Sequence, residues 1–429
     1  MCRARRLEAA EKPRYNKEQR AGHKGPAGQG RETQMEKQNC ALRLRGLVVF
    51  RGLLRDETVS AMLRLLETDA HDRAAFADAY GAFCTLLFAK TDDWSSYLSK
   101  CVLEHEDLYV VRLCAEGNVP DALARALDEE LAFLGGLCGL SAADVKGEDA
   151  ALAFLPEWRA SETDLAAAYR ERIANVHKTG YGMFARWHVF TVKDGALIPV
   201  EHPDPQTLDE LPGYEAEREK IVANTQALLD GRPANNVLLY GDAGTGKSSA
   251  VKAIANRFAP DGLRLVEVKK HQLYQIPKLM DSLAANPLKF ILFIDDLSFT
   301  ANDDNFAALK AILEGSVGGR SANIAVYATS NRRHLIKETL SDRGGDDIHH
   351  ADTMQELMSL SARFGLTVTF LRPDKDRFVH IVTELAERYG VDVPHDELIV
   401  RAEAFAIRSG GRSPRVARQF IELCRSGVL

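Results

Sequence analysis

The segment from Val237 to Ser249 places the strongest constraint on how this chain can fold. Four apolar or aromatic residues at 237–240 predict a short buried strand, and residues 249–255 continue at helical spacing. Between them lies a match to G-x-x-x-x-G-K-[ST], which in a strand–loop–helix context predicts a phosphate-binding loop. Glycines let backbone N–H groups turn toward a polyphosphate, and the helix N-terminus adds positive potential. The residues expected to cradle a nucleotide are Gly241, Asp242, Ala243, Gly244, Thr245, Gly246, Lys247, Ser248 and Ser249.

Within this loop, two side chains have expected roles of their own. Lys247 would reach the β- and γ-phosphates, and the Ser248 hydroxyl would contact Mg²⁺. The competing interpretation is a glycine-rich turn before an ordinary helix. The flanking strand and helix favour the phosphate site.

A pair of carboxylates follows the most apolar stretch of the chain. Residues 290–294 are all apolar, which predicts a strand buried on both faces, and Asp295 and Asp296 come directly after it. Ligands bind at the carboxyl ends of strands in open α/β sheets. We expect Asp295 to hold Mg²⁺ through water and Asp296 to orient or deprotonate an attacking water. The alternative is a pair of acidic turn residues.

Two more polar residues stand where they could meet the same ligand. Asn331 follows the apolar strand predicted at 324–328, and an amide there can position water against a γ-phosphate. Ser413 and Pro414 predict the cap and first residue of the last helix, so Arg415 projects from its first turn. Because a helix dipole disfavours a cation at that end, a nearby anion would explain Arg415. The alternatives are a turn residue and a solvated arginine.

Charge and cysteine content limit the remaining possibilities. The net charge of the whole chain is −6. Residues 1–45 carry 12 Lys+Arg against 5 Asp+Glu, so the net charge of this segment is +7 and that of the rest of the chain is −13. An acidic body argues against a broad nucleic-acid surface, although a local patch is compatible with it. The seven cysteines are scattered without a C-x-x-C pair, which fits a reducing cytoplasm. No apolar run reaches the roughly 20 residues of a membrane helix.

The chain before the phosphate loop divides at a proline-rich linker. Residues 1–40 are polar, basic and glycine-rich, and we expect a disordered tail, more plausibly solvated than bound to nucleic acid. Residues 41–200 are mostly helical in pattern, with β-branched and aromatic residues at 181–200 that suggest a strand or two. Pro203 and Pro205 then mark a linker. The helical region shows no catalytic pattern and is expected to be a separate regulatory or partner-binding domain.

Together these motifs resemble the AAA+ branch of P-loop ATPases, from about residue 204 to the C-terminus. Gly241–Ser248 is similar to Walker A, Phe290–Asp296 to Walker B, and Asn331 to the sensor-1 position. Arg363 resembles an arginine finger and Arg415 the sensor-2 residue, in a segment similar to that of the Holliday-junction branch-migration motor. The stretch is also similar to an uncharacterised prokaryotic family of predicted ATPases.

This resemblance implies a fold and a division into domains. The fold class is α/β: an AAA+ P-loop core with a five-stranded parallel sheet in the order 5-1-4-3-2, a C-terminal helical lid and a mostly helical N-terminal domain. The expected divisions are a tail at 1–40, the helical domain at 41–200, the core at 204–372 and the lid at 373–429.

The resemblance also implies an activity, with ATP and Mg²⁺ as ligands. The chain would be a cytoplasmic ATPase without membrane attachment, acting on a protein or nucleic-acid client through its N-terminal domain. Arg363 would reach a neighbouring subunit's γ-phosphate, so a homo-oligomeric ring or filament is implied.

One residue departs from the AAA+ pattern. Most members end Walker B with Asp-Glu, whereas this chain has Asp295-Asp296, and the shorter side chain reaches about 1.5 Å less far. Either hydrolysis is expected to be slow, or Asp296 is expected to act through a second water. Two alternatives stay open: a nucleotide-dependent assembly switch or loader with little hydrolysis, and a DNA-processing motor.

Overall fold

The computed structural model describes residues 37–69, 71–147, 149–298, 305–314, 322–331 and 362–429. The chain divides into two compact units. Unit 1 comprises residues 1–46, 54–94 and 139–161, and unit 2 comprises residues 47–53, 95–138 and 162–429. Each unit is described by itself. The division predicted from the sequence into a helical domain, a core and a lid stays a prediction.

Unit 1 is helical and has an aromatic core. Its elements are a helical stretch at 37–45, α2 (Glu57–Glu67), α3 (Arg73–Phe88), α7 (Ala142–Lys146) and η2 (Ala150–Leu152). Asp56 caps α2 by accepting from the N–H groups of the first turn. The ring of Phe83 lies edge-on to Trp94 and Trp158, with centroids 5.4 and 4.9 Å away. Edge-to-face aromatic packing of this kind stabilises a small core.

The helix at 37–45 corrects one sequence expectation. Residues 1–36 lie outside the described part of the chain, but residues 37–40, which we expected to be disordered, are helical. Lys37 is buried, its Nζ donates to the Val145 carbonyl, and it lies 5.4 Å from the centroid of the Phe76 ring. Burial lowers the pKa of Lys37. A lysine stem can cover apolar surface while its ammonium finds an acceptor, and a polar sequence pattern does not reveal this.

The N-terminal part of unit 2 is also helical. Asp107 caps α5 by accepting from the Val110 N–H at 2.9 Å, and it accepts a second bond of 2.8 Å from the Tyr169 hydroxyl of α8. The buried carboxylate thereby joins two helices that are distant in sequence. The elements here are η1 (Arg51–Arg55), α4 (Trp94–Leu103), α5 (Leu108–Glu116), α6 (Asp121–Cys138), α8 (Leu165–Ala174), α9 (Val176–Thr179) and α10 (Met183–Arg186).

The rest of unit 2 is built on one sheet. Its strands lie in the order β2-β1-β4-β5-β6-β3-β7, and all neighbours are parallel except β1 and β2. From β3 onward this is the predicted order 5-1-4-3-2, so the AAA+ fold is confirmed. The strands are β1 (Val189–Lys193), β2 (Ala196–Pro199), β3 (Val237–Gly241), β4 (Leu263–Val268), β5 (Lys289–Ile294), β6 (Ile324–Ser330) and β7 (Leu366–Phe370).

The expected number of five strands is wrong, because the sheet has seven strands within the described residues. The predicted strands at 181–200 form as β1 and β2, and β1 adds to the edge strand β4 with Phe190 opposite Val266. This addition buries the apolar face of β1 and covers what would otherwise be an exposed edge. The sheet therefore begins at Val189, before the predicted linker.

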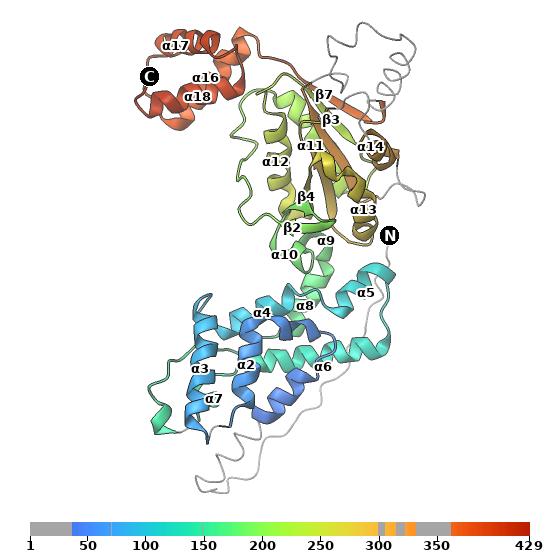
Figure 1. The fold of residues 1–429 in the computed structure, drawn as a ribbon, viewed down its shortest axis with the longest axis vertical. Coiled ribbons are helices and arrows are strands. Elements are labelled where there is room, and N and C mark those ends of the chain that lie inside the picture. The colour runs from blue at the N-terminus through green and yellow to red at the C-terminus, as the bar shows by residue number, and fades with distance from the viewer. Residues whose placement is uncertain (1–36, 70, 148, 299–304, 315–321, 332–361) are drawn as a thin grey trace. The chain divides into compact units, whose positions relative to one another are not determined.

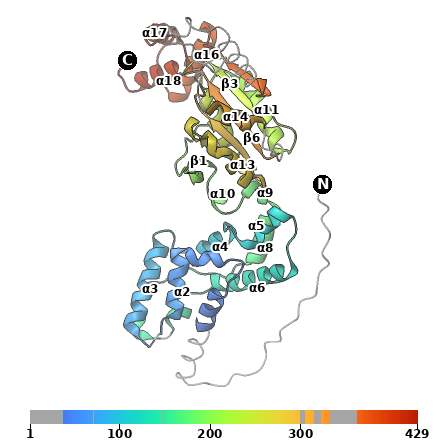
Figure 2. The ribbon, with the colours of Figure 1, turned by 45° about the vertical axis from the view of Figure 1, so that its right-hand side comes forward.

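Helices cover both faces of the sheet (Figures 1 and 2). Alternate side chains of a strand point to opposite faces, so Leu239 packs with the buried residues of α12 and Leu238 packs with those of α13 and α14. The strands are buried on both sides, which explains their unbroken apolar sequences. The elements of these layers are α11 (Glu215–Leu229), α12 (Lys247–Phe258), η3 (Ala259–Asp261), η4 (Lys270–Gln275), α13 (Ile276–Ala284) and α14 (Asn305–Glu314).

Three helices follow β7, as the sequence predicts: α16 (Lys375–Tyr389), α17 (His395–Arg408) and α18 (Pro414–Arg425). Ser413 caps α18 and Pro414 is its first residue, which confirms both assignments. The helix expected at 353–362 falls almost entirely outside the described residues. Within the described part of the chain, no helix combines the length and the apolar character needed to cross a bilayer.

The added strand β1 should be a structural part of the sheet. Phe190 is fully buried and its ring lies 5.0 Å from that of Phe184, so Phe190→Ala should cost about 3–5 kcal/mol of unfolding free energy. Ile198→Ala on β2 is the control, because its side chain is 42% exposed and should cost under about 1 kcal/mol. Hydrogen exchange of the β4 amides measures both. Equal protection of β4 in wild type and Phe190→Ala would contradict this role.

Candidate functional site

The loop at 241–246 joins β3 to α12 and needs glycine for two different reasons. A Cβ on Gly241 would lie 2.0 Å from the carbonyl oxygen of Phe370, so only glycine allows β7 to pass this closely. Gly244 and Gly246 have φ of +78° and +88°, a region that glycine adopts without strain. The predicted phosphate loop therefore has the backbone turn that its pattern requires.

The side chain of Lys247 is directed back over this loop. Its Nζ donates to the carbonyl oxygens of Gly241 and Asp242, at 2.9 and 2.7 Å, and to Oδ1 of Asn331 at 3.0 Å. Burial lowers the pKa of Lys247, an effect that three nearby aspartates oppose. All three ammonium protons are thus directed at oxygen acceptors around the loop, where phosphate oxygens could replace them.

The ends of β5 and β6 bring Asp295 to the start of α12. Oδ1 of Asp295 accepts from the Ser248 hydroxyl at 2.6 Å and from the Thr329 hydroxyl at 2.5 Å. The two residues predicted to share a metal ion therefore lie in direct contact. Thr329 was not among the predicted site residues, and its position at the tip of a strand is the only signal that the sequence offered for it.

Asp296 has an unusual backbone conformation. Its φ is +51°, which is uncommon outside glycine and costs of the order of 1 kcal/mol or more. Its N–H donates to the Thr329 hydroxyl at 2.9 Å, and its Oδ1 accepts from Asn331 Nδ2 at 2.9 Å. Asn331 therefore bridges Lys247 and Asp296. The predicted sensor residue joins the phosphate loop to the second carboxylate.

The last helix also touches the phosphate loop. The Arg415 N–H donates to the Gly244 carbonyl at 3.2 Å, and a Cβ on Gly244 would lie 3.2 Å from both Cβ of Arg415 and Oγ of Ser413. The exposed Arg415 side chain lines the same cavity as Lys247. The structure thus brings Arg415 to the predicted site by a close backbone contact.

These residues surround one cavity of about 470 Å³, a size typical of small-molecule sites. Gly241 and Asp242 are not among the described residues that line it. The predicted residues in its lining are Ala243, Gly244, Thr245, Gly246, Lys247, Ser248, Ser249, Asp295, Asp296, Asn331 and Arg415. Others in the lining come from the chain before α11, from α11 itself and from α18, among them Gln206, Arg218 and Arg418.

Gln206 links the phosphate loop to the last helix. With its amide nitrogen toward Ser249 and its oxygen toward Arg418, it makes hydrogen bonds of 3.0 and 2.8 Å. The Asn256 side chain of α12 holds the Gln206 carbonyl at 2.9 Å. Reasoning from the sequence missed Gln206, because only the fold brings this segment beside Ser249.

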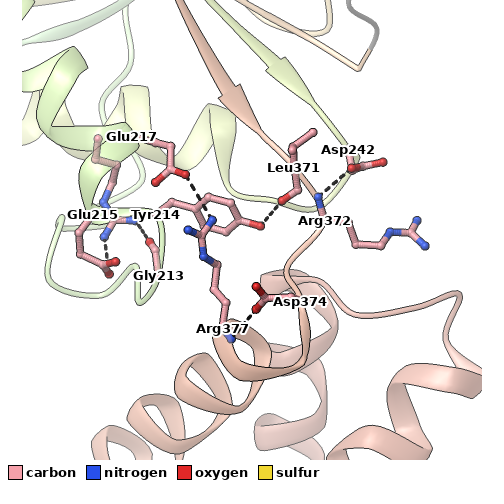
Figure 3. A network of polar contacts seen from close by, with 10 residues as sticks. Gly213, Tyr214, Glu215, Glu217, Asp242, Leu371, Arg372, Asp374 and Arg377 are labelled. Carbon is pink, nitrogen blue, oxygen red and sulfur yellow. Dashed lines mark hydrogen bonds and ion pairs between the residues drawn. The ribbon is translucent and has the colours of Figure 1, made fainter.

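The Asp242 side chain contacts the segment that enters the lid helices (Figure 3). Its carboxylate accepts from the Arg372 N–H at 2.8 Å. The neighbouring Leu371 carbonyl accepts from the Tyr214 hydroxyl at 2.5 Å, and the Arg377 guanidinium lies 4.7 Å from the Tyr214 ring centroid. Burial raises the pKa of Tyr214 to about 12. Asp242 was predicted as a cradle residue, which stays a prediction, and its side chain joins the loop to this connection.

Arg363 lies away from these residues. It precedes β7, which runs parallel to β3 with Leu366 opposite Val237 and Phe370 opposite Gly241. A five-residue strand spans about 13 Å, so Arg363 stands at the far end of the sheet, beyond the reach of its own cavity. Arg363 is not among the described residues that line that cavity.

The sequence of this region matches a known family. The profile of a family described as "Protein of unknown function (DUF815)" matches residues 182–427, more than half of the chain. A proteasome-activating nucleotidase from Methanocella arvoryzae is 25% identical over 253 residues, which are 51% of this chain and 59% of the nucleotidase.

Two solved structures also align with this chain. The RuvB Holliday junction branch migration motor of Thermotoga maritima aligns with 19% identity and a TM-score of 0.36, over 52% of this chain and 65% of the motor. A mutant form of that motor aligns with 18% identity and a TM-score of 0.35. The chain spans less than two thirds of the length of these proteins and of the nucleotidase.

The contact between Gly244 and α18 should matter for ligand binding. Gly244→Ala adds a Cβ against Arg415 and should weaken binding of a fluorescent ADP analogue about tenfold, or about 1.4 kcal/mol. Gly410→Ala is the matched control, because Gly410 has a similar φ of +87° but no heavy atom within 4 Å of the added Cβ. Equal effects of the two substitutions would show that backbone strain, not the contact, is responsible.

Proposed function

The chain belongs to the family described as protein of unknown function (DUF815), and from that premise we propose that it is an AAA+ ATPase that couples ATP binding and hydrolysis to conformational work on a macromolecular client. One observation carries the proposal: Asn331 bridges Lys247 and Asp296 beside the Ser248–Asp295 contact. A phosphate-binding lysine, a metal-binding pair and a carboxylate able to act on water then meet in one cavity.

The phosphate loop would bind the triphosphate. Backbone N–H groups at 243–248 would face the phosphates at the start of α12, where the helix dipole favours anions. Lys247 would exchange its bonds to the loop carbonyls for bonds to phosphate oxygens. Arg415 and Arg418 also line the cavity and would add positive charge from the lid.

The contact between Ser248 and Asp295 fits Mg²⁺. This ion prefers oxygen ligands and usually takes only one or two from the protein, with phosphate and water supplying the rest. Ser248 and Asp295 would hold it, and when bound it would offset the charge of the phosphate oxygens. Among the described residues, no three or more His, Cys, Asp or Glu side chains are grouped so that they could hold a metal ion.

Asp296 would orient the attacking water and accept its proton. Its backbone N–H donates to Thr329 and its carboxylate accepts from Asn331, and these two bonds hold the residue in the lining of the cavity. Asn331 would hold the same water or the γ-phosphate through its amide. Geometry is stringent in such sites, so the short side chain of Asp296 is consistent with slow turnover.

Arg363 would complete the site of a neighbouring chain. Its place at the far end of the sheet supports a role between subunits in a ring or filament. The helical region before residue 200 would contact the client, which would be a protein or a nucleic acid.

A second candidate function is a nucleotide-dependent assembly switch. The observation that favours it is Asp296 itself, whose short carboxylate is already engaged by Asn331. Such a switch would assemble into oligomers when it binds ATP, and it would hydrolyse the ATP to a negligible extent.

Asp296→Asn separates hydrolysis from binding. The amide keeps the shape of the carboxylate but cannot accept a proton, so turnover should fall by about 10²-fold or more while ATP affinity changes little. Steady-state phosphate release and equilibrium titration measure the two effects. Asp194→Asn is the control, because Asp194 is an exposed aspartate with a similar φ of +52°. Full activity of Asp296→Asn would remove Asp296 from the mechanism.

The role of Arg363 predicts complementation between two inactive chains. Lys247→Ala should lack activity because it cannot hold phosphate, and Arg363→Ala should lose on the order of 10³-fold. Mixed together, they should recover activity, since a finger from the Lys247→Ala chain can enter a site of the Arg363→Ala chain. Arg388→Ala, an exposed arginine of α16, serves as control. A mixture as inactive as its components would contradict action between subunits.

A further inference from the structure

A cationic surface lies at the same edge of the sheet as the nucleotide cavity. It is formed by the end of β1 and the turn that follows it, at 192–195, and by the end of β4, η4 and the start of α13, at 268–278. These segments contain four lysines and one acid, Asp194, a net charge of +4 − 1 = +3 in a chain of −6. We call this the η4 surface. Its basic residues are Lys193, Lys269, Lys270, His271 and Lys278.

An exposed aromatic ring belongs to the same segment, between Lys270 and Lys278 in sequence. Tyr274 is 68% exposed, although most large side chains of the neighbouring segments, such as Leu273 and Ile276, are buried. Its hydroxyl accepts a 2.7 Å hydrogen bond from Gln275. Lys193, Lys269, His271 and Lys278 are exposed as well. Glu267 is half-buried on β4, and Asp281 lies one turn beyond Lys278.

The η4 surface is held in a fixed shape by side-chain amides. Gln272 Nε2 donates to the Val192 carbonyl at 2.6 Å, and Gln275 Oε1 accepts from the Gly195 N–H at 3.0 Å. Gln272 Oε1 also accepts from the Lys269 N–H at 2.9 Å. These bonds bring Lys193 and the η4 lysines, about 75 residues apart in sequence, onto one surface. The charges are therefore placed together by the fold.

We propose that the η4 surface binds single-stranded nucleic acid, with a base stacked on Tyr274 and backbone phosphates held by the surrounding lysines. An exposed ring among cations provides both contacts that single strands use, base stacking and phosphate neutralisation. A duplex would leave no free base face for the ring. The surface shares no residue with the described lining of the nucleotide cavity.

One contact connects the η4 surface to the nucleotide site. Lys270 Nζ donates to the Ser298 carbonyl at 2.5 Å, two residues beyond Asp296, and the Leu297 N–H donates to the Thr329 carbonyl at 2.7 Å. The segment that follows Asp295 and Asp296 is thus hydrogen-bonded to η4, which is part of the surface that would hold the nucleic acid. A ligand on this surface and a nucleotide in the cavity would contact the two ends of one short segment.

The test measures binding of a fluorescein-labelled oligothymidylate of about 20 nucleotides, longer than the ~4–16 that one groove covers. Anisotropy is followed with the full chain at low salt and without nucleotide, so failure here leaves the proposed ATPase intact. Tyr274→Ala should weaken binding about tenfold or more, and Tyr274→Phe should keep it, because stacking needs only the ring. Phe154→Ala, which removes an equally exposed ring in unit 1, should have no effect.

Salt dependence tests the lysines. Replacing Lys193 and Lys269 with alanine should reduce the slope of log K against log salt by about 0.7 for each phosphate that is no longer neutralised, and Lys220→Ala on α11 should not. Three results would overturn the proposal: no binding by wild type, unchanged binding by Tyr274→Ala, or equal binding of a duplex. Displacement by polyglutamate as readily as by unlabelled oligonucleotide would indicate an acidic protein partner instead.

Discussion

The site depends on one strand, β3, lying between β6 and β7. On one side this pairing places the end of β6, with Thr329 and Asn331, against the phosphate loop. On the other side it brings Phe370 so close that only glycine fits at position 241, and it delivers the lid segment beside Asp242. The phosphate loop, the carboxylates and the lid entry thus share one framework, and a shift of β3 would move all three.

Much of this arrangement follows from local sequence. The loop pattern, the apolar runs of β5 and β6, and the cap at Ser413 all depend on residues close together in the chain, so the loop, Asp295, Asn331 and α18 could be predicted and located. The strand order followed from the family resemblance. In each case the residues that indicate the chemistry lie within about ten positions of one another in the sequence.

The missed features are those that require contact between distant segments. The sequences of β1 and β2 predict strands. They do not indicate that β1 pairs with β4, because a separate hairpin within the helical region would fit the same residues. Thr329 and Gln206 are ordinary polar residues until the fold puts them beside Asp295 and Ser249. Asp242 fits the loop pattern, yet its side chain is held by Arg372, about 130 residues later.

Two hydrogen bonds hold the peptide group between Leu371 and Arg372 and restrict rotation where the chain enters the lid. The carbonyl held by Tyr214 and the N–H held by Asp242 belong to the same peptide group, so that plane cannot rotate while both bonds persist. Pro373 follows, and its ring fixes φ near −65°. Few backbone torsion angles therefore remain free to rotate between β7 and α16, and they lie next to one another in the chain. Any rotation of helices α16–α18 relative to the sheet would have to use these few torsion angles.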